Sequence, residues 1–394
     1  MKSGDIGFRR LLLKRGEGRR VERGHLWVFA NEVERLEDGE GDEAAVIAAD
    51  GRFLGSAILS PSALIRARLY SRRPERLDAA LIHARLQAAL DFRRRFDLIG
   101  PAWRLCFSDS DGLPGLIVDL YSSHAVVQLT TAAMDARRQA VVEALKNIIQ
   151  PASIYERSDV PARRLEGLDD RTGLIFGSTP AVVEITGEEY YLLDVVGGQK
   201  TGHYLDMRFN RLYLAALAAG RRVLELCCYT GAFSIGAARR GAACVAAVDS
   251  SASALALARE GARRAGVADL CEFEQGDASE TAIRWQREKR RFDLILVDPP
   301  PFARSKKDAG AALRAYRDLN LRAMRLLAPG GILATASCSH HVSPEDFLHA
   351  LRMAARDARA DLRLLHAAGQ APDHPVHLAT PETAYLKFFV FEKM

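Results

Sequence analysis

The second half of this sequence alternates short apolar runs with helical segments, and this alternation restricts the fold more than any other feature. It begins at Arg221 and continues to the end of the chain. The predicted strands are Val223–Leu226, Cys244–Asp249, Cys271–Gln275, Phe292–Val297 and Gly331–Ala336. Strands that alternate with helices form parallel, doubly wound sheets. We therefore predict an α/β, Rossmann-like domain, in which ligands bind at the carboxyl ends of the strands.

Acidic residues accompany four of these strands. Glu225 stands by the first turn, Asp249 ends the second strand, Asp277 follows the third, and Asp298 follows the fourth in an Asp-Pro-Pro motif. The first turn lacks the GxGxxG glycines that let a backbone approach a pyrophosphate, which disfavours a dinucleotide. Carboxylates can instead accept the hydroxyls of a ribose or meet the edge of an adenine. The pattern predicts a nucleoside cofactor without phosphates, S-adenosyl-L-methionine (SAM).

Two of these acids have a structural alternative. Asp249 and Asp277 each follow a strand and precede a helix, where aspartate is a common N-cap. A cap explains either residue alone. It explains the four acids in register much less well, and the cofactor interpretation is therefore favoured.

The composition is typical of a soluble protein with several domains. The chain has 394 residues, 48% hydrophobic and 27% charged, and this length favours two or three domains. It shows no signal peptide and no apolar run long enough to span a bilayer, which predicts a cytoplasmic protein with no membrane partner. Its cysteines lack the CxxC spacing of zinc sites, which argues against a metal centre and a disulfide scaffold.

Basic residues gather at the N-terminus, although the net charge is only +5. Residues 1–24 contain Lys2, Arg9, Arg10, Lys14, Arg15, Arg19, Arg20 and Arg23, against Asp5, Glu17 and Glu22. Such a segment is often a solvated terminus. Here, short β-like runs joined by Gly-rich turns follow it as far as Tyr70, as in a small barrel. We predict that residues 1–72 form a barrel that binds a nucleic acid.

Two further domains follow the barrel. A helix is predicted over residues 75–96, then a dense turn at Asp109–Gly115, and then strands and a helix as far as Tyr191. We assign a central α+β domain to residues 73–190 and the Rossmann-like domain to residues 191–394.

Several motifs together resemble one protein family. They are Gly24–Phe29, Asp111–Leu116, Lys200–Arg208, Asp298-Pro299-Pro300 and Ser337-Cys338-Ser339. Over nearly its full length the chain is similar to the bacterial 23S rRNA (cytosine-C5) methyltransferases. These combine an N-terminal PUA domain, a central α+β domain and a C-terminal class I SAM-dependent domain. The resemblance implies a PUA-like barrel, SAM as cofactor and large-subunit ribosomal RNA as partner. It leaves open whether the protein is a homodimer.

The resemblance also implies site residues. In the family, the segment that matches Lys200–Arg208 lies over the cofactor, so Lys200, Tyr204 and Arg208 are expected to hold its methionine end. The matching residues that line the same site are Glu225, Tyr229, Thr230, Gly231, Asp249, Asp277 and Asp298.

Cys338 is the candidate nucleophile. Position C5 of cytosine attacks a methyl sulfonium poorly, but a thiolate that adds at C6 turns the ring into an enamine. An acid at the N3 edge stabilises this adduct, and Asp298 is expected to supply it from the neighbouring strand. An isolated cysteine is more often a small buried hydrophobe, so the Ser337-Cys338-Ser339 context carries this assignment.

One position departs from the two-cysteine RNA cytosine methyltransferases. They have a second cysteine directly after Asp-Pro-Pro, where this chain has Pro301. The chain therefore resembles a one-cysteine enzyme, and the base that removes the C5 proton is unassigned. His340 and His341 are near in sequence, although loop histidines of this kind are commonly inert.

Three other functions compete with cytosine methylation. Asp298-Pro-Pro-x-Phe302 resembles the motif with which amino methyltransferases hold a flipped purine, a route that needs no cysteine. A noncatalytic RNA-binding assembly factor would keep the fold without the cofactor. A nicotinamide oxidoreductase is disfavoured by the missing glycines. The methylated nucleotide cannot be read from the sequence.

Overall fold

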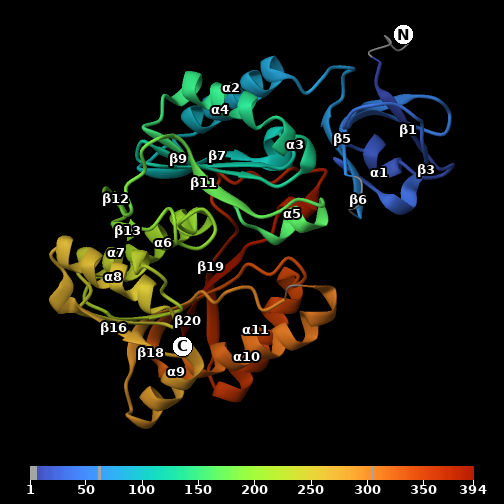
Figure 1. The fold of residues 1–394 in the computed structure, drawn as a ribbon. Helices are drawn as coiled ribbons and strands as arrows, with labels where there is room; N and C mark the ends of the chain where they lie inside the picture. The colour runs from blue at the N-terminus through green and yellow to red at the C-terminus, as the bar shows by residue number, and fades with distance from the viewer. Residues whose placement is uncertain (1–6, 61–63, 304) are drawn as a thin grey trace. The chain divides into compact units, whose positions relative to one another are not determined.

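The computed structural model of the chain describes residues 7–60, 64–303 and 305–394. Lys2 and Asp5 lie outside these ranges. The chain forms two compact units. Unit one contains Met1–Ala181, Val195–His203 and Pro372–Thr383. Unit two contains Val182–Asp194, Tyr204–Ala371 and Ala384–Met394. Figure 1 follows the chain through its elements. The predicted boundaries after residues 72 and 190 stay predictions.

The N-terminal part of unit one is a curled six-stranded sheet in the order β2-β6-β5-β4-β1-β3. Its strands are β1 (Arg9–Leu13), β2 (Trp27–Phe29), β3 (Val33–Leu36), β4 (Glu43–Ile47), β5 (Phe53–Leu59) and β6 (Ile65–Ser71), with the short helix α1 at Arg19–Glu22. Strand β1 runs through the basic N-terminal segment and pairs with β3 and β4. Leu11 and Leu13 of β1 are buried in the core of the sheet. For residues 9–13 the solvated-terminus interpretation is therefore wrong.

The rest of unit one is built on a five-stranded sheet in the order β11-β10-β9-β8-β7. The strands are β7 (Ala102–Phe107), β8 (Leu116–Tyr121), β9 (His124–Leu129), β10 (Ser153–Ser158) and β11 (Arg171–Gly177). The helices are α2 (Ala79–Arg95), α3 (Ala132–Ala136), α4 (Arg138–Ile149) and α5 (Pro161–Leu165). Helices α2 and α4 pack against each other and cover the sheet (Figure 1). Their apolar residues fall at helical spacing, which is why the sequence indicated them.

Trp27 and Arg68 join the curled sheet to the five-stranded one within unit one. The indole Nε1 of Trp27 donates to Asp109 Oδ1 at 3.1 Å, and Arg68 Nη1 donates to Asp109 Oδ2 at 3.2 Å. The Arg68 guanidinium also lies over the Trp27 ring, 5.0 Å from its centroid. Trp27 belongs to the first family motif and Asp109 lies just before the second. The two motifs are thus linked by side-chain contacts that hold the curled sheet in place.

Unit two contains a seven-stranded sheet in the order β16-β15-β14-β17-β18-β20-β19. Its strands are β14 (Arg222–Leu226), β15 (Cys244–Asp249), β16 (Cys271–Gln275), β17 (Phe292–Val297), β18 (Leu327–Ser337), β19 (Leu362–Ala368) and β20 (Lys387–Lys393). A separate pair, β12 (Val183–Ile185) and β13 (Tyr191–Leu193), packs beside α8 (Ala252–Arg264). Strand β20 is antiparallel to both β18 and β19, while β14 to β18 run parallel.

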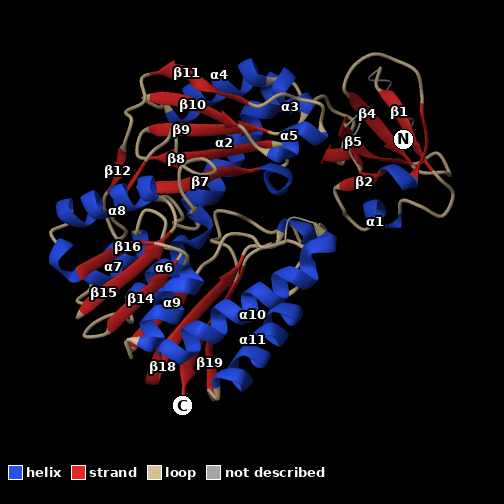
Figure 2. Ribbon diagram, turned by 60° about the horizontal axis from the view of Figure 1, so that its bottom comes forward, coloured by secondary structure: helices blue, strands red, loops and turns tan. Residues whose placement is uncertain are grey.

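Alternate side chains of this sheet enter two different apolar cores. Leu224 and Leu226 contact one core, whereas Val223, the residue before Leu224, contacts the other. The first core is shared with α9 (Ala278–Arg287), α10 (Ala309–Leu326) and α11 (Pro344–Ala358), and the second with α6 (Arg208–Ala215) and α7 (Ala232–Arg239). Figure 2 shows α10 and α11 side by side along the sheet. Helices thus cover both faces, and the predicted doubly wound α/β fold is confirmed.

The strand order reverses between β14 and β17, which are direct neighbours although β15 and β16 lie between them in sequence. A crevice opens at such a point outside the carboxyl ends of the strands. The predicted site residues Glu225, Asp249, Asp277 and Asp298 all lie at this edge of the sheet. Among the helices of the described ranges, none combines the length and apolarity that a membrane crossing requires.

Candidate active site

The turn between β14 and α7 is held in a strained backbone conformation. Cys227 and Tyr229 have φ values of 67° and 51°, and Gly231 has a φ of 73°. A Cβ on Gly231 would also lie 3.0 Å from the Phe273 ring, so this position requires glycine. The backbone N–H groups of Cys227 and Cys228 donate to Val248 O at 2.8 and 3.0 Å. The turn is therefore fixed against β15 before any ligand binds.

Asp249 stabilises the same turn from the end of β15. Its Oδ2 accepts a hydrogen bond from Tyr229 N at 2.8 Å, and its Oδ1 accepts one from Ser251 N at 2.9 Å. The N-cap of α8 is Ser251, so the capping alternative for Asp249 is wrong. Each carboxylate oxygen has a second lone-pair direction beyond these bonds. Asp249 can therefore orient the turn and still accept a hydroxyl.

Asp277 is the N-cap of α9. Its Oδ1 accepts hydrogen bonds from Ser279 N and Glu280 N, both at 2.9 Å. The structural alternative considered for this aspartate is thus realised. The bonds engage one carboxylate oxygen, and the expected contact of Asp277 with an adenine edge stays a prediction.

Glu225 is buried beneath the turn, where it fixes the first turn of α7. Its Oε2 accepts hydrogen bonds from both the backbone N–H and the hydroxyl of Ser234. Burial raises the pKa of Glu225 to about 8, and the negative charge of Asp298 adds to the effect. The carboxyl is therefore mostly neutral at pH 7.

The predicted acids converge on one thiol in the middle of the turn. Burial raises the pKa of Cys227 well above its usual range, the charges of Asp249, Asp298 and Asp277 raise it further, and Glu225 adds to this where it is ionised. Four carboxyl groups from four different strands thus act on a single atom. The structure brings together the acids that the sequence placed at this edge, and it leaves Cys227 an inert, protonated thiol.

Tyr204 lies between this turn and the ends of β17 and β18. Its ring meets the Tyr229 ring edge-on, with centroids 5.4 Å apart. Burial raises the pKa of Tyr204, and the charges of Tyr229, Asp298 and Cys338 raise it further. Its backbone is held by Arg211, a buried residue that sequence reasoning missed, whose Nη1 donates to Tyr204 O at 2.8 Å.

The other two predicted cofactor residues of the Lys200–Arg208 motif are Arg208 and Lys200. Arg208 begins α6, and its guanidinium lies over the Phe209 ring, 5.2 Å from the centroid. Lys200 has a φ of 53° and belongs to unit one. Their expected roles at the cofactor stay predictions.

An acid and a thiol stand at the ends of two adjacent strands. Strands β17 and β18 run parallel, with Val297 opposite Thr335. Asp298 follows β17 directly, and Cys338 follows the last residue of β18. The Asp298 N–H donates to Leu226 O of β14 at 3.3 Å, which ties the Asp-Pro-Pro segment to the cofactor turn. Cys338 is half-buried, unlike the fully buried Cys106 and Cys228.

Ser339 anchors the segment that carries Cys338. Its hydroxyl oxygen shares a hydrogen bond with Tyr316 OH at 2.9 Å and accepts one from Ala303 N at 3.3 Å. Its carbonyl oxygen accepts a hydrogen bond from Lys387 Nζ at 2.6 Å. Sequence reasoning missed Tyr316 and Lys387. The signal for Lys387 was a lysine directly before the apolar run Phe388–Phe391 of a buried strand.

The residues present fit a nucleoside cofactor. The Thr230 hydroxyl is buried beside the turn and has no hydrogen-bond partner within the described ranges, so a ligand atom can satisfy it. Asp249 offers acceptors for ribose hydroxyls. Across those same ranges, no group of three or more His, Cys, Asp or Glu side chains is arranged to hold a metal ion.

Comparisons with known proteins agree with this architecture. A family model for S-adenosylmethionine-dependent methyltransferases matches residues 173–391. A model for PUA-like domains matches residues 11–72. The chain belongs to the SAM-dependent methyltransferase family, and SAM is its cofactor.

Two curated relatives match nearly the whole chain. The ribosomal RNA large subunit methyltransferase I of Aeromonas hydrophila is 39% identical over 391 residues, which cover 96% of this chain and 98% of that protein. The enzyme of the same name from Klebsiella pneumoniae is 37% identical over 401 residues, covering 99% and 100%.

Solved structures share the fold. A protein described as a SAM-dependent methyltransferase from Streptococcus mutans superimposes with a TM-score of 0.84 at 21% identity, covering 97% of this chain and 99% of that chain. A methyltransferase solved in complex with SAH gives a TM-score of 0.85 at the same identity and coverage. At 21% identity, the similarity shows a shared fold.

Proposed function

We propose that this protein methylates C5 of a cytosine in large-subunit ribosomal RNA through a covalent adduct with Cys338. The observation that carries the proposal is the position of Cys338 and Asp298 at the ends of adjacent parallel strands, with Tyr204 close to both. The names of the relatives support ribosomal RNA as the substrate. The Cys338 context supports cytosine as the base.

The proposed chemistry divides between two residues. The Cys338 thiolate adds to C6 of the cytosine, which makes C5 nucleophilic. Asp298 hydrogen-bonds the N3 edge and stabilises the adduct. When bound, SAM supplies the electrophilic methyl group. After transfer, C5 loses its proton, the bond from C6 to Sγ breaks, and Cys338 leaves as a thiolate.

The cofactor is proposed to bind over the β14–α7 turn. Asp249 would accept the ribose hydroxyls and Asp277 would meet the adenine edge. The turn itself would contribute Glu225, Tyr229, Thr230 and Gly231. Lys200, Tyr204 and Arg208 would hold the methionine end. The Thr230 hydroxyl, buried and without a partner in the described ranges, supports this placement.

The test is a substrate that traps the adduct. RNA that carries 5-fluorocytosine should form a covalent complex with the wild-type enzyme and SAM, because fluorine cannot leave as a proton. Mass spectrometry should locate the link at Cys338 and identify 5-methylcytosine in unmodified RNA. A methylated purine as the product would overturn the proposal. The Asp298-Pro-Pro-x-Phe302 motif would then hold the base, although the Phe302 ring already packs against Tyr316 in a tilted arrangement, with ring centroids 4.8 Å apart.

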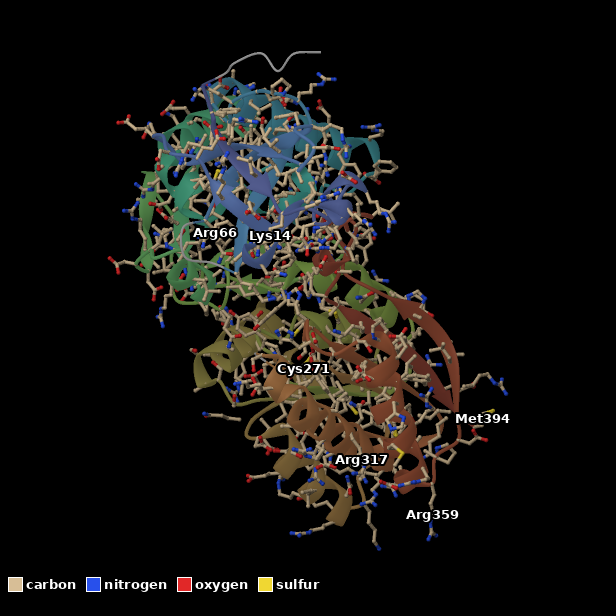
Figure 3. The ribbon with its side chains drawn as sticks, turned by 90° about the vertical axis from the view of Figure 1, so that its right-hand side faces the viewer. Lys14, Arg66, Cys271, Arg317, Arg359 and Met394 are labelled. Atoms are coloured by element: carbon tan, nitrogen blue, oxygen red, sulfur yellow. The ribbon has the colours of Figure 1, made fainter. Side chains whose placement is uncertain are left out.

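We further propose that the curled sheet of unit one binds the RNA backbone. Lys14 follows β1 and Arg66 lies in β6, and Figure 3 labels both. Arg15, Arg19 and Arg23 are exposed on the same sheet's loops and short helix. Phosphate contacts of this kind are independent of sequence and weaken with salt.

Replacing Arg15, Arg19 and Arg23 by glutamine should therefore make RNA affinity less dependent on salt. If each contacts a phosphate, the slope of log K against log salt should flatten by about two to three. The matched control replaces Arg287, Arg352 and Arg359, which are exposed on unit two. Equal flattening in the control set would count against a role for the curled sheet.

A further inference from the structure

Lys387 is a buried lysine beside the proposed nucleophile. It is the first residue of β20, and its partner across the β18–β20 ladder is Ser337, the residue before Cys338. It is only 6% exposed, and the four residues after it are all buried and apolar. A lysine at such a position must be compensated by polar contacts, because burial disfavours its charged form.

Two backbone carbonyls provide these contacts. Lys387 Nζ donates to Ser339 O at 2.6 Å and to Tyr385 O at 2.8 Å. The side chain therefore holds the residue after Cys338, while its backbone pairs with the residue before it. Both partners are neutral, so neither cancels the positive charge of the ammonium group. Within the described residues, the titratable group whose charge acts on Lys387 is Cys338.

Two tyrosines, an aspartate and a histidine are among the described residues around Cys338. Burial raises the pKa of the Tyr204 and Tyr316 hydroxyls, and a negative charge on Cys338 raises both further. Both hydroxyls therefore stay neutral. Asp298 carries a negative charge at the end of β17, and His340 is exposed and stacks on the Tyr385 ring. A cation close to Cys338 favours its thiolate form.

We propose that Lys387 is a positioning residue for Cys338: its ammonium group holds the Cys338 segment through Ser339 O and stabilises the thiolate form of the nucleophile. This inference rests on the proposed function only for what the thiolate does, which is to add to C6 of the cytosine. The proton of the thiol passes to solvent, and Lys387 keeps its own. Burial lowers the pKa of Lys387 to about 8, so the group is still mostly cationic at pH 7.

The experiment measures ionisation of Cys338 directly, without RNA or SAM. The full-length protein is treated with iodoacetamide across a pH series, and mass spectrometry follows alkylation of the peptide that contains Cys338. The exposed Cys244 is replaced by serine in every variant to lower the background. The variants are Lys387→Met, Lys387→Gln and Lys387→Arg. Lys387→Gln keeps an amide donor without charge and serves where the methionine variant fails to fold.

The matched control lies at the other end of the same strand. Lys393 Nζ also donates to two backbone carbonyls, Met324 O at 3.3 Å and Leu327 O at 3.0 Å. Lys393→Met therefore removes a similar lysine far along β20 from Cys338. A second control, Ser339→Ala, loosens the Cys338 segment on the Tyr316 side and leaves the Lys387 charge in place.

Removal of the cation should raise the pH midpoint of Cys338 alkylation. We expect the rate at pH 7 to fall about tenfold in Lys387→Met and Lys387→Gln, a shift of about one pH unit. Lys387→Arg should recover most of the rate, and Lys393→Met and Ser339→Ala should keep the wild-type midpoint. Unchanged midpoints in both neutral Lys387 variants, or an equal shift in Lys393→Met, would overturn the proposal. Failure of 5-fluorocytosine trapping would refute the proposed function and leave this measurement intact.

Discussion

The two halves of the site in unit two are built in different ways. The cofactor half, at the ends of β14, β15 and β16, is organised by contacts between neighbouring backbone turns, such as Asp249 with Tyr229 N and Ser251 N. The catalytic half, at the ends of β17 and β18, is organised by side chains from distant segments. Tyr316 and Lys387 meet at Ser339 from α10 and β20.

Because of this difference, substitutions should have different effects in the two halves. In the cofactor half, several side-chain and backbone contacts together hold the turns, so a single substitution should weaken SAM binding without abolishing it. In the catalytic half, one thiol carries the proposed chemistry and one serine connects the segments around it. Substitutions in the two halves should therefore divide cleanly between loss of binding and loss of turnover.

The largest effect is expected for Cys338→Ala. Because the proposed adduct at C6 depends on the Cys338 thiolate, turnover should fall by at least about a thousandfold, while SAM and RNA affinities stay within about twofold. Single-turnover methylation and calorimetry measure the two quantities. The control is Cys244→Ser, which changes an exposed cysteine at the start of β15. Near-normal methylation by Cys338→Ala would remove the thiol from the mechanism.

A smaller effect, on binding, is expected for Asp249→Ala. Hydrogen bonds to a charged carboxylate are worth roughly 1.5 to 3 kcal/mol each, so loss of the ribose contacts should weaken SAM binding at least about tenfold. Ser251→Ala perturbs the neighbouring N-cap without removing a carboxylate and should leave the affinity nearly unchanged. If calorimetry gives both folded variants the wild-type affinity, Asp249 does not hold the cofactor.

The smallest functional effect is expected for Glu225→Gln. The folded-state pKa of Glu225 is raised to about 8, above its unfolded value of 4.5, so its contribution to stability is complete below that unfolded value and is lost as the pH rises toward 8. Glutamine keeps the acceptor for Ser234 and cannot ionise. SAM affinity at pH 7 should change less than about twofold.

Denaturation at several pH values checks the stability side of this prediction. Between pH 5 and 8, the wild type should lose stability relative to Glu225→Gln by at most about 1.4 kcal/mol per pH unit. An equal difference in unfolding free energy between the wild type and Glu225→Gln at pH 5 and at pH 8 would mean that Glu225 ionises normally in the folded protein.

The same division explains how much of the site could be predicted from sequence. The doubly wound sheet followed from apolar strands that alternate with helices, and the carboxylates of Asp249 and Asp298 were found because strand ends are local features. The capping role of Asp277 was open, because a cap and a ligand contact use the same residue type in the same place. Lys387 and Tyr316 were missed because their relation to Cys338 arises only when β20 and α10 pack against the end of β18.

At the N-terminus, the sequence predicted a barrel over residues 1–72 but no strand over residues 9–13. Arg9 and Arg10 suggested a solvated terminus, but the strand they begin is fixed by the alternating Leu11 and Leu13, whose burial depends on pairing with β3 and β4. Only Arg10 is exposed on the outer face of this strand, and the buried pair Leu11 and Leu13 was too short a pattern to be recognised.

The insertion of β20 between β18 and β19 also orders events during synthesis. Strand β19 leaves the ribosome before β20, yet its hydrogen-bonded neighbour in the sheet is β20, so it must wait unpaired until the later strand arrives. The segment around Cys338 likewise gains its contact with Lys387 only after β20 has been made.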